Sequence, residues 1–122
     1  KLEPFLVRWL EGSDLAEQKQ AARLVLYTGA HNPGTLGPLM RILERDSPDD
    51  LKELAIGAIG TIGVPADPAI PLLESYVARG GDLGTYAART IKMIASAHKI
   101  QEIREEEAAE AEQKKREAGG GN

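Results

Sequence analysis

One stretch of small and aliphatic residues recurs three times along the chain, and this repeat limits the possible folds more than any other feature. The copies occupy residues 21–29, 55–63 and 87–95. Their starts are separated by about 33 residues, and a period of this length is typical of helical repeat proteins. A second motif begins with Pro-Leu at residue 38 and recurs at residue 71, one period later. Because a single helix pair cannot bury both of its faces, such pairs stack and share one continuous core.

The apolar residues of the middle repeat are spaced for two amphipathic helices. The first helix would bury Leu51, Leu54, Ala55, Ala58, Ile59 and Ile62, and the second Ala69, Ile70, Leu73, Tyr76 and Val77. Ser47-Pro48 and Asp67-Pro68 are expected to begin these helices, because Ser and Asp cap free N–H groups and Pro suits the first turn. Gly63 and Gly80-Gly81 are expected to end them.

The flanking segments fit the same scheme. Asp14 and Glu17 have the spacing of a capping box, Gly29 would end that helix, and Thr35 would cap the next one. Residues 1–10 are expected to form a lone helix of a preceding repeat. Its predicted buried residues are Leu2, Phe5, Leu6, Trp9 and Leu10.

The chain changes character at His98. Ile100 and Ile103 are the last large apolar residues, and acidic residues, basic residues and finally glycines follow. High helix propensity and acid-before-base pairs at i, i+4 spacing favour a charged helix that leaves the domain. We therefore predict an all-α domain over residues 1–97 and a charged helical extension with a Gly-rich end over residues 98–122.

Composition excludes several classes of function. The formal net charge of −4 gives no general attraction to nucleic acid. The chain has no cysteine, so it forms no disulfide and no Cys-based zinc site. It also has no apolar run long enough to span a membrane. These features leave the compartment open between the cytoplasm and export.

The middle repeat resembles a known family. Residues 58–63, Ala-Ile-Gly-Thr-Ile-Gly, and residues 68–74, Pro-Ala-Ile-Pro-Leu-Leu-Glu, look like the short bacterial HEAT repeat of phycobilisome-lyase-type proteins. The resemblance extends over about residues 1–97. It implies an α-solenoid of about three HEAT-like helix pairs, which usually scaffolds or binds other proteins.

No set of residues points to catalysis, a metal or a cofactor. His31 and His98 lack metal-ligand spacing from another His or from a carboxylate cluster. The acidic residues at 46–50 lack the alternating ligands and terminal Glu of a calcium loop, and they suit a helix start. We therefore expect a protein that is not an enzyme.

Arginines recur at the repeat period on the predicted second helices. Arg45 and Arg79 are separated by one repeat, and so are Arg8 and Arg41. Stacking would align them into a face that binds acidic or planar groups of a partner. The alternative is an ordinary solvated face with interleaved glutamates.

The extension has two interpretations as well. It is either a solvent-exposed or disordered charged segment, or an arm that docks on a partner through Ile100 and Ile103.

These observations predict a protein–protein interaction or scaffolding module that belongs to a larger assembly. One alternative is an accessory component of a lyase-type enzyme, which the family resemblance motivates. Another is a nucleic-acid-binding HEAT-like domain, which would need a basic face that the net charge disfavours. The partner itself is expected to be another protein.

Overall fold

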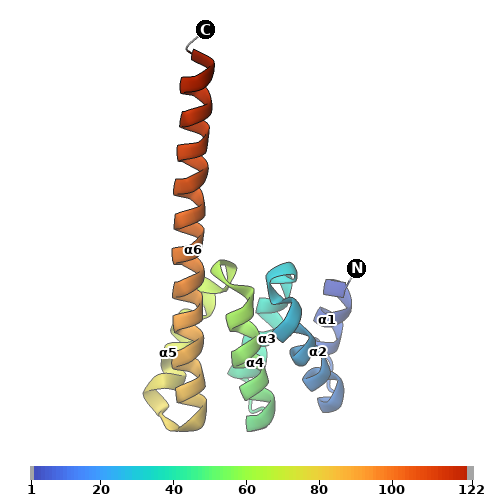
Figure 1. The fold of residues 1–122 in the computed structure, drawn as a ribbon. Helices are drawn as coiled ribbons and strands as arrows, with labels where there is room; N and C mark the ends of the chain where they lie inside the picture. Colours follow the sequence, from blue (N-terminus) through green and yellow to red (C-terminus); the bar gives the residue numbers. More distant parts are fainter. Residues whose placement is uncertain (1, 121–122) are drawn as a thin grey trace.

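The computed structural model describes residues 2–120 and is helical throughout, without a strand in that range (Figure 1). Three 3-10 segments, η1 (Gly29–His31), η2 (Pro33–Thr35) and η3 (Val64–Ala69), connect the α helices. The α helices are α1 (Leu2–Glu11), α2 (Leu15–Thr28), α3 (Leu36–Glu44), α4 (Asp49–Ile62), α5 (Ile70–Arg79) and α6 (Gly81–Gly120). The predicted all-α class is confirmed, and the described residues form six α helices.

Successive helices run in opposite directions and form two rows (Figure 1). In one row α2 packs on α4 and α4 packs on α6, and the helices α1, α3 and α5 pack on α2, α4 and α6 respectively. The first part of α6 belongs to the body, whereas its second part extends away alone (Figure 1).

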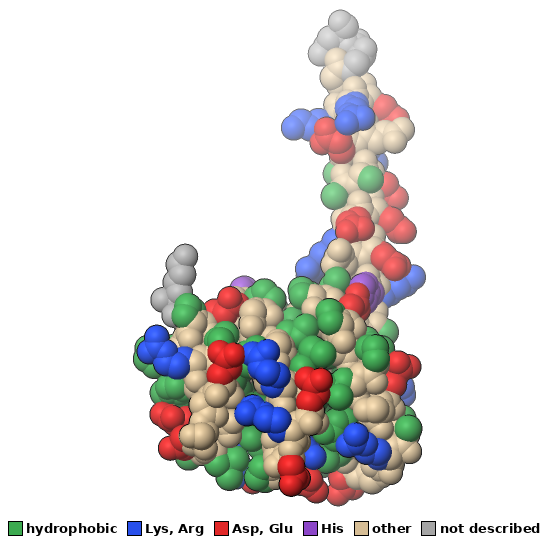
Figure 2. All heavy atoms as spheres, turned by 180° about the vertical axis from the view of Figure 1, so that it is seen from behind, with side chains coloured by type: hydrophobic (Ala, Val, Ile, Leu, Met, Phe, Trp, Pro, Cys, Tyr) green, Lys and Arg blue, Asp and Glu red, His purple; other side chains and the backbone are tan. Residues whose placement is uncertain are grey.

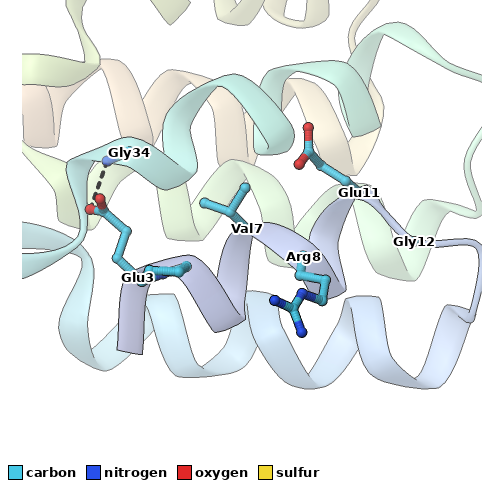
Figure 3. A pocket seen from close by; sticks show the side chains of 7 residues that line it. Glu3, Val7, Arg8, Glu11, Gly12 and Gly34 are labelled. Carbon is cyan, nitrogen blue, oxygen red and sulfur yellow. Dashed lines mark hydrogen bonds between the residues drawn. The ribbon is translucent and has the colours of Figure 1, made fainter. Parts of the chain in front are cut away.

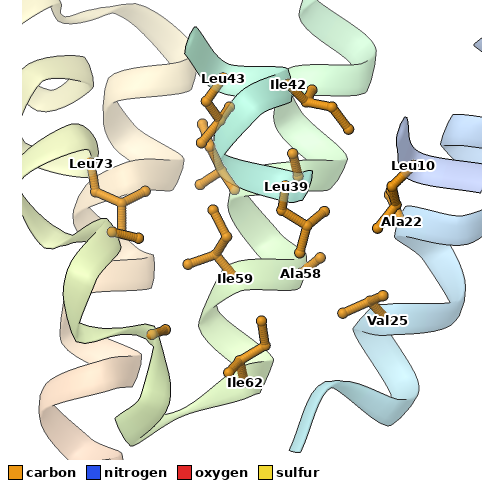
Figure 4. Packing of buried hydrophobic residues seen from close by; sticks show 14 of the residues in the cluster. Leu10, Ala22, Val25, Leu39, Ile42, Leu43, Ala58, Ile59, Ile62 and Leu73 are labelled. Atoms are coloured by element: carbon orange, nitrogen blue, oxygen red, sulfur yellow. The ribbon is translucent and has the colours of Figure 1, made fainter. Parts of the chain in front are cut away.

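The core follows the apolar spacing of the sequence. Ile59 of α4 and Leu73 of α5 are fully buried, and Figure 4 shows Ile59 between Leu73 and Leu39 of α3. Ala55, Ala58 and Ala69 are also fully buried, so small residues lie where helices approach closely. Val77 is 40% exposed although its spacing predicted burial, because it lies at the edge of the α5 stripe.

Two other residues predicted in the core are exposed, namely Leu2 (43%) and Phe5 (55%). They lie on α1, the first helix described, which packs on α2 and α3 and leaves its opposite side uncovered. Phe5 meets Trp9 in an edge-to-face contact with 5.8 Å between ring centroids. Leu6 and Leu10 on the covered side are buried as predicted.

The helix starts agree with the sequence at one position and differ at others. The Asp14 carboxylate accepts a hydrogen bond from the Glu17 N–H at 3.1 Å, as a cap does. The predicted caps Thr35 and Ser47 instead donate their hydroxyls backwards, to the carbonyls of Asn32 (2.7 Å) and Ile42 (2.8 Å). The Ile42 carbonyl lies in the last turn of α3, where carbonyls lack a partner within the helix. The Asn32 carbonyl also accepts a hydrogen bond from the Thr35 N–H at 3.1 Å.

Asp67 makes no cap either, because α5 begins only at Ile70 and η3 precedes it. Gly63, Gly80 and Gly81 have φ of 83°, 79° and 73°, as expected at helix ends. Gly29 differs from them, since its φ is −53°.

Two glycines within helices, Gly60 and Gly84, permit close approach of neighbouring helices. A methyl group at Gly60 of α4 would lie 3.1 Å from the Met93 sulfur and 3.3 Å from Thr90 of α6. At Gly84 of α6 it would lie 2.9 Å from the Tyr76 carbonyl oxygen of α5. The close packing of α6 on α4 and on α5 therefore depends on the absence of a side chain at Gly60 and at Gly84.

Truncating the core at Ile59 or Leu73 tests the helix register. Ile59→Ala or Leu73→Ala should lower the free energy of unfolding by about 2–5 kcal/mol, because each leaves a cavity that its neighbours fill incompletely. Urea unfolding followed by far-UV circular dichroism measures the loss. Val77→Ala, on the same helix as Leu73 but exposed, should cost less than about 1 kcal/mol. Equal losses in all three variants would show that the register is wrong.

Two helical glycines should respond to Ala in opposite directions. Gly84→Ala should destabilise the protein, because the backbone of α5 has to move away from the new methyl group. Gly37→Ala should be neutral or stabilise by up to about 1 kcal/mol, since Ala is the better helix former and only the Arg41 guanidinium lies near, at 3.5 Å. Thermal unfolding of both variants decides the matter, and a Gly84→Ala protein as stable as the unsubstituted chain would contradict the proposed reason for this glycine.

Candidate protein-interaction surfaces

The four arginines singled out by the repeat lie in one row of helices. Arg8 is in α1, Arg41 in α3 and Arg79 in α5, and Arg45 directly follows α3. All four are exposed. On the face of the molecule seen in Figure 2, basic and acidic side chains are interspersed and form no field of one sign.

Contacts hold three of these guanidinium groups in place. Arg41 Nη2 lies 2.6 Å from Glu11 Oε2, and Arg45 Nε donates to the Arg41 carbonyl oxygen at 3.2 Å. The Arg79 guanidinium lies over the ring of Tyr76, 4.7 Å from its centroid. The Tyr76 hydroxyl in turn donates to the Leu43 carbonyl, so α5 is tied to the end of α3 beside Arg45.

Arg8 stands apart from this group. It lines a shallow hollow of about 490 Å³ along α1, together with Glu3, Val7, Glu11 and Gly34. In Figure 3 the Arg8 guanidinium and the Glu11 carboxylate point in opposite directions, while Glu3 accepts a hydrogen bond from the Gly34 N–H at 3.0 Å. Glu11 therefore pairs with Arg41 and not with Arg8. The hollow is lined by the carboxylates of Glu3 and Glu11 as well as by the Arg8 guanidinium.

The second half of α6 forms an arm with no cover from the described part of the body. Residues 99–119 are all exposed, including Ile100 (50%) and Ile103 (44%). Gln101 donates to Glu105 at 3.1 Å and Arg116 lies 3.7 Å from Glu112. Such contacts at i, i+4 spacing support a helix that lacks tertiary packing.

A polar contact holds α6 to the body at the residue just before the arm begins. His98 Nε2 lies 2.7 and 2.8 Å from the two carboxylate oxygens of Asp67 in η3. The His98 side chain is 41% exposed. The contact marks where α6 leaves the body.

Sequence reasoning missed an apolar groove in the other row of helices. It has a volume of about 280 Å³, and its lining residues are Leu26, Glu53, Leu54, Gly57, Tyr86, Arg89, Thr90 and Met93. Gly57 opens it by omitting a side chain from α4, with Leu26 on one side and Met93 on the other. The glycine was visible in the sequence, but its position between two neighbouring helices needed the tertiary structure.

An ion pair connects α2 and α4 at the border of this row. Lys19 Nζ contacts Asp50 Oδ2. The hydrogen bond from Lys19 is the main reason that the pKa of the Asp50 carboxyl is lowered, although desolvation opposes it. Because the folded-state pKa is depressed, the pair stabilises the fold above the unfolded pKa, and this contribution disappears as the pH falls through the folded pKa.

Within the described range 2–120, no three His, Asp or Glu side chains are grouped so that they could hold a metal ion. None of the helices in that range is long and apolar enough to cross a membrane. Comparisons with protein-family models, curated proteins and solved structures yield no match to this chain.

Removing Lys19 tests the origin of the Asp50 shift. In Lys19→Met the pKa of Asp50 should rise, because the carboxylate loses its main hydrogen-bond donor. Lys52→Met, on the same helix as Asp50, removes an equal charge without touching that hydrogen bond, so it should change the pKa much less. Carboxyl-resolved NMR titration distinguishes the two variants. A similar response in both would show that general charge, and not the Lys19 contact, lowers the pKa.

Proposed function

We propose that this chain is a HEAT-like α-solenoid segment that serves as a non-enzymatic protein-interaction and scaffolding module. Three features support the solenoid. The sequence repeats with a period of about 33 residues, α2, α4 and α6 pack on one another in series, and glycines permit the close helix approach. Stacked helices of this kind offer an extended surface, which suits binding of an elongated partner segment.

The observation that carries the proposal is the set of Arg41, Arg45 and Arg79 in the row α1, α3 and α5. All three are exposed, and contacts with Glu11, with the Arg41 carbonyl and with the Tyr76 ring hold their guanidinium groups. A held guanidinium loses less conformational freedom on binding than a free side chain. The set is therefore suited to carboxylates of a partner protein, which Arg binds with two parallel hydrogen bonds.

The weak ion pair between Arg41 and Glu11 allows a carboxylate of a partner protein to take the place of Glu11. Its ion pair with Glu11 is about half exposed on both sides, and exposed pairs contribute only about 0–1 kcal/mol. A carboxylate of a partner can replace Glu11 at little cost. Each new charge-assisted hydrogen bond is worth about 1–3 kcal/mol, so several arginines together are needed for useful affinity.

The net charge limits the kind of partner. A chain of net charge −4 with interspersed charges attracts no long polyanion. A short acidic segment of a protein would contact only Arg41, Arg45 and Arg79, so the negative charges elsewhere on the chain would repel it less. We therefore favour an acidic protein segment over nucleic acid.

A combined substitution tests the surface formed by Arg41, Arg45 and Arg79, here called the arginine surface. Arg41→Ala, Arg45→Ala and Arg79→Ala in one chain should abolish capture of the partner proteins that the unsubstituted chain retains from an extract. Quantitative mass spectrometry of the captured proteins provides the readout, after circular dichroism has verified the fold.

The matched control removes three cations from the other row, by Arg23→Ala, Arg89→Ala and Lys92→Ala. It changes the net charge equally and should leave capture intact. If the first variant still captures its partners, or if both variants lose them alike, the arginine surface is not the binding site.

A further inference from the structure

The exposed large apolar side chains in the described part of α6 lie on one line along the helix. They are Met93 (45% exposed), Ile100 and Ile103. Because an α helix has about 3.6 residues per turn, residues in alternating steps of three and four share one side. In α6 these steps give a stripe, here called the α6 stripe, of Asp82, Tyr86, Arg89, Met93, Ser96, Ile100, Ile103, Glu107, Glu110 and Lys114. None of these residues is buried, and the stripe runs from the body onto the arm.

Two hollows lie along the body part of this stripe, and they differ in charge. The apolar groove contains Tyr86, Arg89 and Met93 of the stripe together with Gly57 of α4. A second hollow, of about 370 Å³, lies where α4 and α6 begin, and its charged lining residues are Asp49, Asp50, Glu53 and Asp82. An apolar groove followed by an acidic hollow fits a helix that is apolar first and basic further on.

The arm has this order of residues. Ile100 and Ile103 come first, and Lys114 follows about three turns later. We propose that the α6 helices of two copies of this chain pair antiparallel, with a two-fold axis at the level of His98, so that the arm of each copy lies on the α4–α6 face of the other. Each copy then supplies one arm and one face. His98 itself is directed away from the stripe, toward Asp67.

In this register the α6 stripes of the two copies meet layer by layer, as in an antiparallel coiled coil. The facing pairs are Asp82 with Lys114, Tyr86 with Glu110, Arg89 with Glu107, Met93 with Ile103, and Ser96 with Ile100. The two-fold axis repeats every pair, so the centre is mostly apolar and opposite charges lie on both sides of it. Lys114 thereby reaches the acidic hollow. Beside the stripe Lys92 faces Glu106, whereas the exposed Lys99 faces its own copy at the axis.

The charges of the stripe select the register and the orientation. A shift by one heptad places Arg89 opposite Lys114 in one direction and Asp82 opposite Glu107 in the other, and like charges in contact are unfavourable. A parallel pair would place each residue opposite its own copy, so Arg89 would meet Arg89 and Glu107 would meet Glu107. Of these arrangements, only the antiparallel pair centred at His98 brings opposite charges together in both charged layers.

The side of the arm that lies next to α4 also fits. Thr90 of α6 donates to a carbonyl of α4, so its side of the helix faces α4. In the pair, the same side of the arm faces α4 of the other copy, and at steps of seven it carries Arg104, Ala111 and Ala118. Arg104 comes near Glu53 in the groove. The two alanines are small and allow the arm to lie close to the body.

Sedimentation equilibrium of the full chain tests whether the dimer exists. The dimer is expected to be weak, because Met93, Ile100 and Ile103 supply most of the apolar contact. At low salt, where the charged layers are least screened, the chain should show a concentration-dependent equilibrium between monomer and dimer. A monomer at every concentration at low salt would overturn the proposal.

Charge reversal and rescue test the pairing. Glu107→Arg places an arginine opposite Arg89 in both halves of the dimer, and it should raise the dissociation constant at least about tenfold. Adding Arg89→Glu restores the pair with inverted sign and should restore the dimer. The matched control is Glu105→Arg, an equal change of charge that points away from the stripe and should leave the dimer intact. Equal weakening by both single substitutions, or no recovery in the double variant with its helical content intact by circular dichroism, would overturn the proposal.

Disulfide trapping measures the register directly. The chain has no cysteine, so introduced thiols are the only ones present. Met93→Cys mixed with Ile103→Cys should form a crosslinked dimer under mild oxidation. Each variant alone should remain uncrosslinked, because its own thiols would lie about 15 Å apart along the paired helices. Ala95→Cys, exposed on the opposite side of α6, should not crosslink to Ile103→Cys. Crosslinking of this control or of the single variants in preference to the mixture would overturn the proposal.

The dimer and the arginine surface are separate, so each proposal can fail without the other. The variant with Arg23→Ala, Arg89→Ala and Lys92→Ala should weaken the dimer, because it removes two cations that face the arm, and it should still capture partner proteins. The variant without the arginine surface should lose capture and keep the dimer. Loss of the dimer in the second variant and not in the first would place the contact on the other row of helices and overturn the proposal.

Discussion

The structure of the body depends on the burial of α4 between its neighbours. Ala55, Ile56, Ala58 and Ile59 of this helix are fully buried, and α2, α3 and α6 all pack against it. Such burial is possible only because small residues face the closest neighbours: Gly60 admits Thr90 and Met93, and Gly57 admits Leu26. Each buried aliphatic side chain contributes about 1.5–3 kcal/mol by leaving water. The glycines lower helix propensity, and the packing that they permit outweighs this cost.

Side-chain hydrogen bonds to backbone carbonyls set how far each helix slides along the next. Thr90 of α6 donates to the Ile56 carbonyl at 3.1 Å, and the Thr61 hydroxyl of α4 lies 2.8 Å from the Val25 carbonyl. Apolar contacts alone tolerate small shifts, whereas a hydrogen bond to one carbonyl does not. The contact of Thr61 also explains Gly29, where an added methyl group would clash with the Thr61 hydroxyl oxygen. This glycine is needed for close approach and not for a left-handed turn.

Periodicity made the helices and most of the core predictable, because burial against a neighbour recurs at every third or fourth position. The exposure of Leu2 and Phe5 was not predictable in this way, since it depends on what lies beyond α1. The hydroxyls of Thr35 and Ser47 suited either a cap or a carbonyl, and only the local backbone decided between them. For the candidate site, the period brought the arginines into one row, and Arg79 contacts Tyr76 at the i, i+3 spacing of one helix. The contact of Arg41 with Glu11, by contrast, joins two helices and follows from no sequence pattern.

The two parts of the chain are stabilised by different forces, and this difference separates their possible roles. The body is stabilised by its apolar core, so its surface charges can vary without loss of the fold. The arginine surface can therefore bind a partner without being needed for stability. The arm has no core, and its helix relies on propensity and on pairs such as Glu112 with Arg116. A helix that is polar on all sides gains from any complementary surface laid along it.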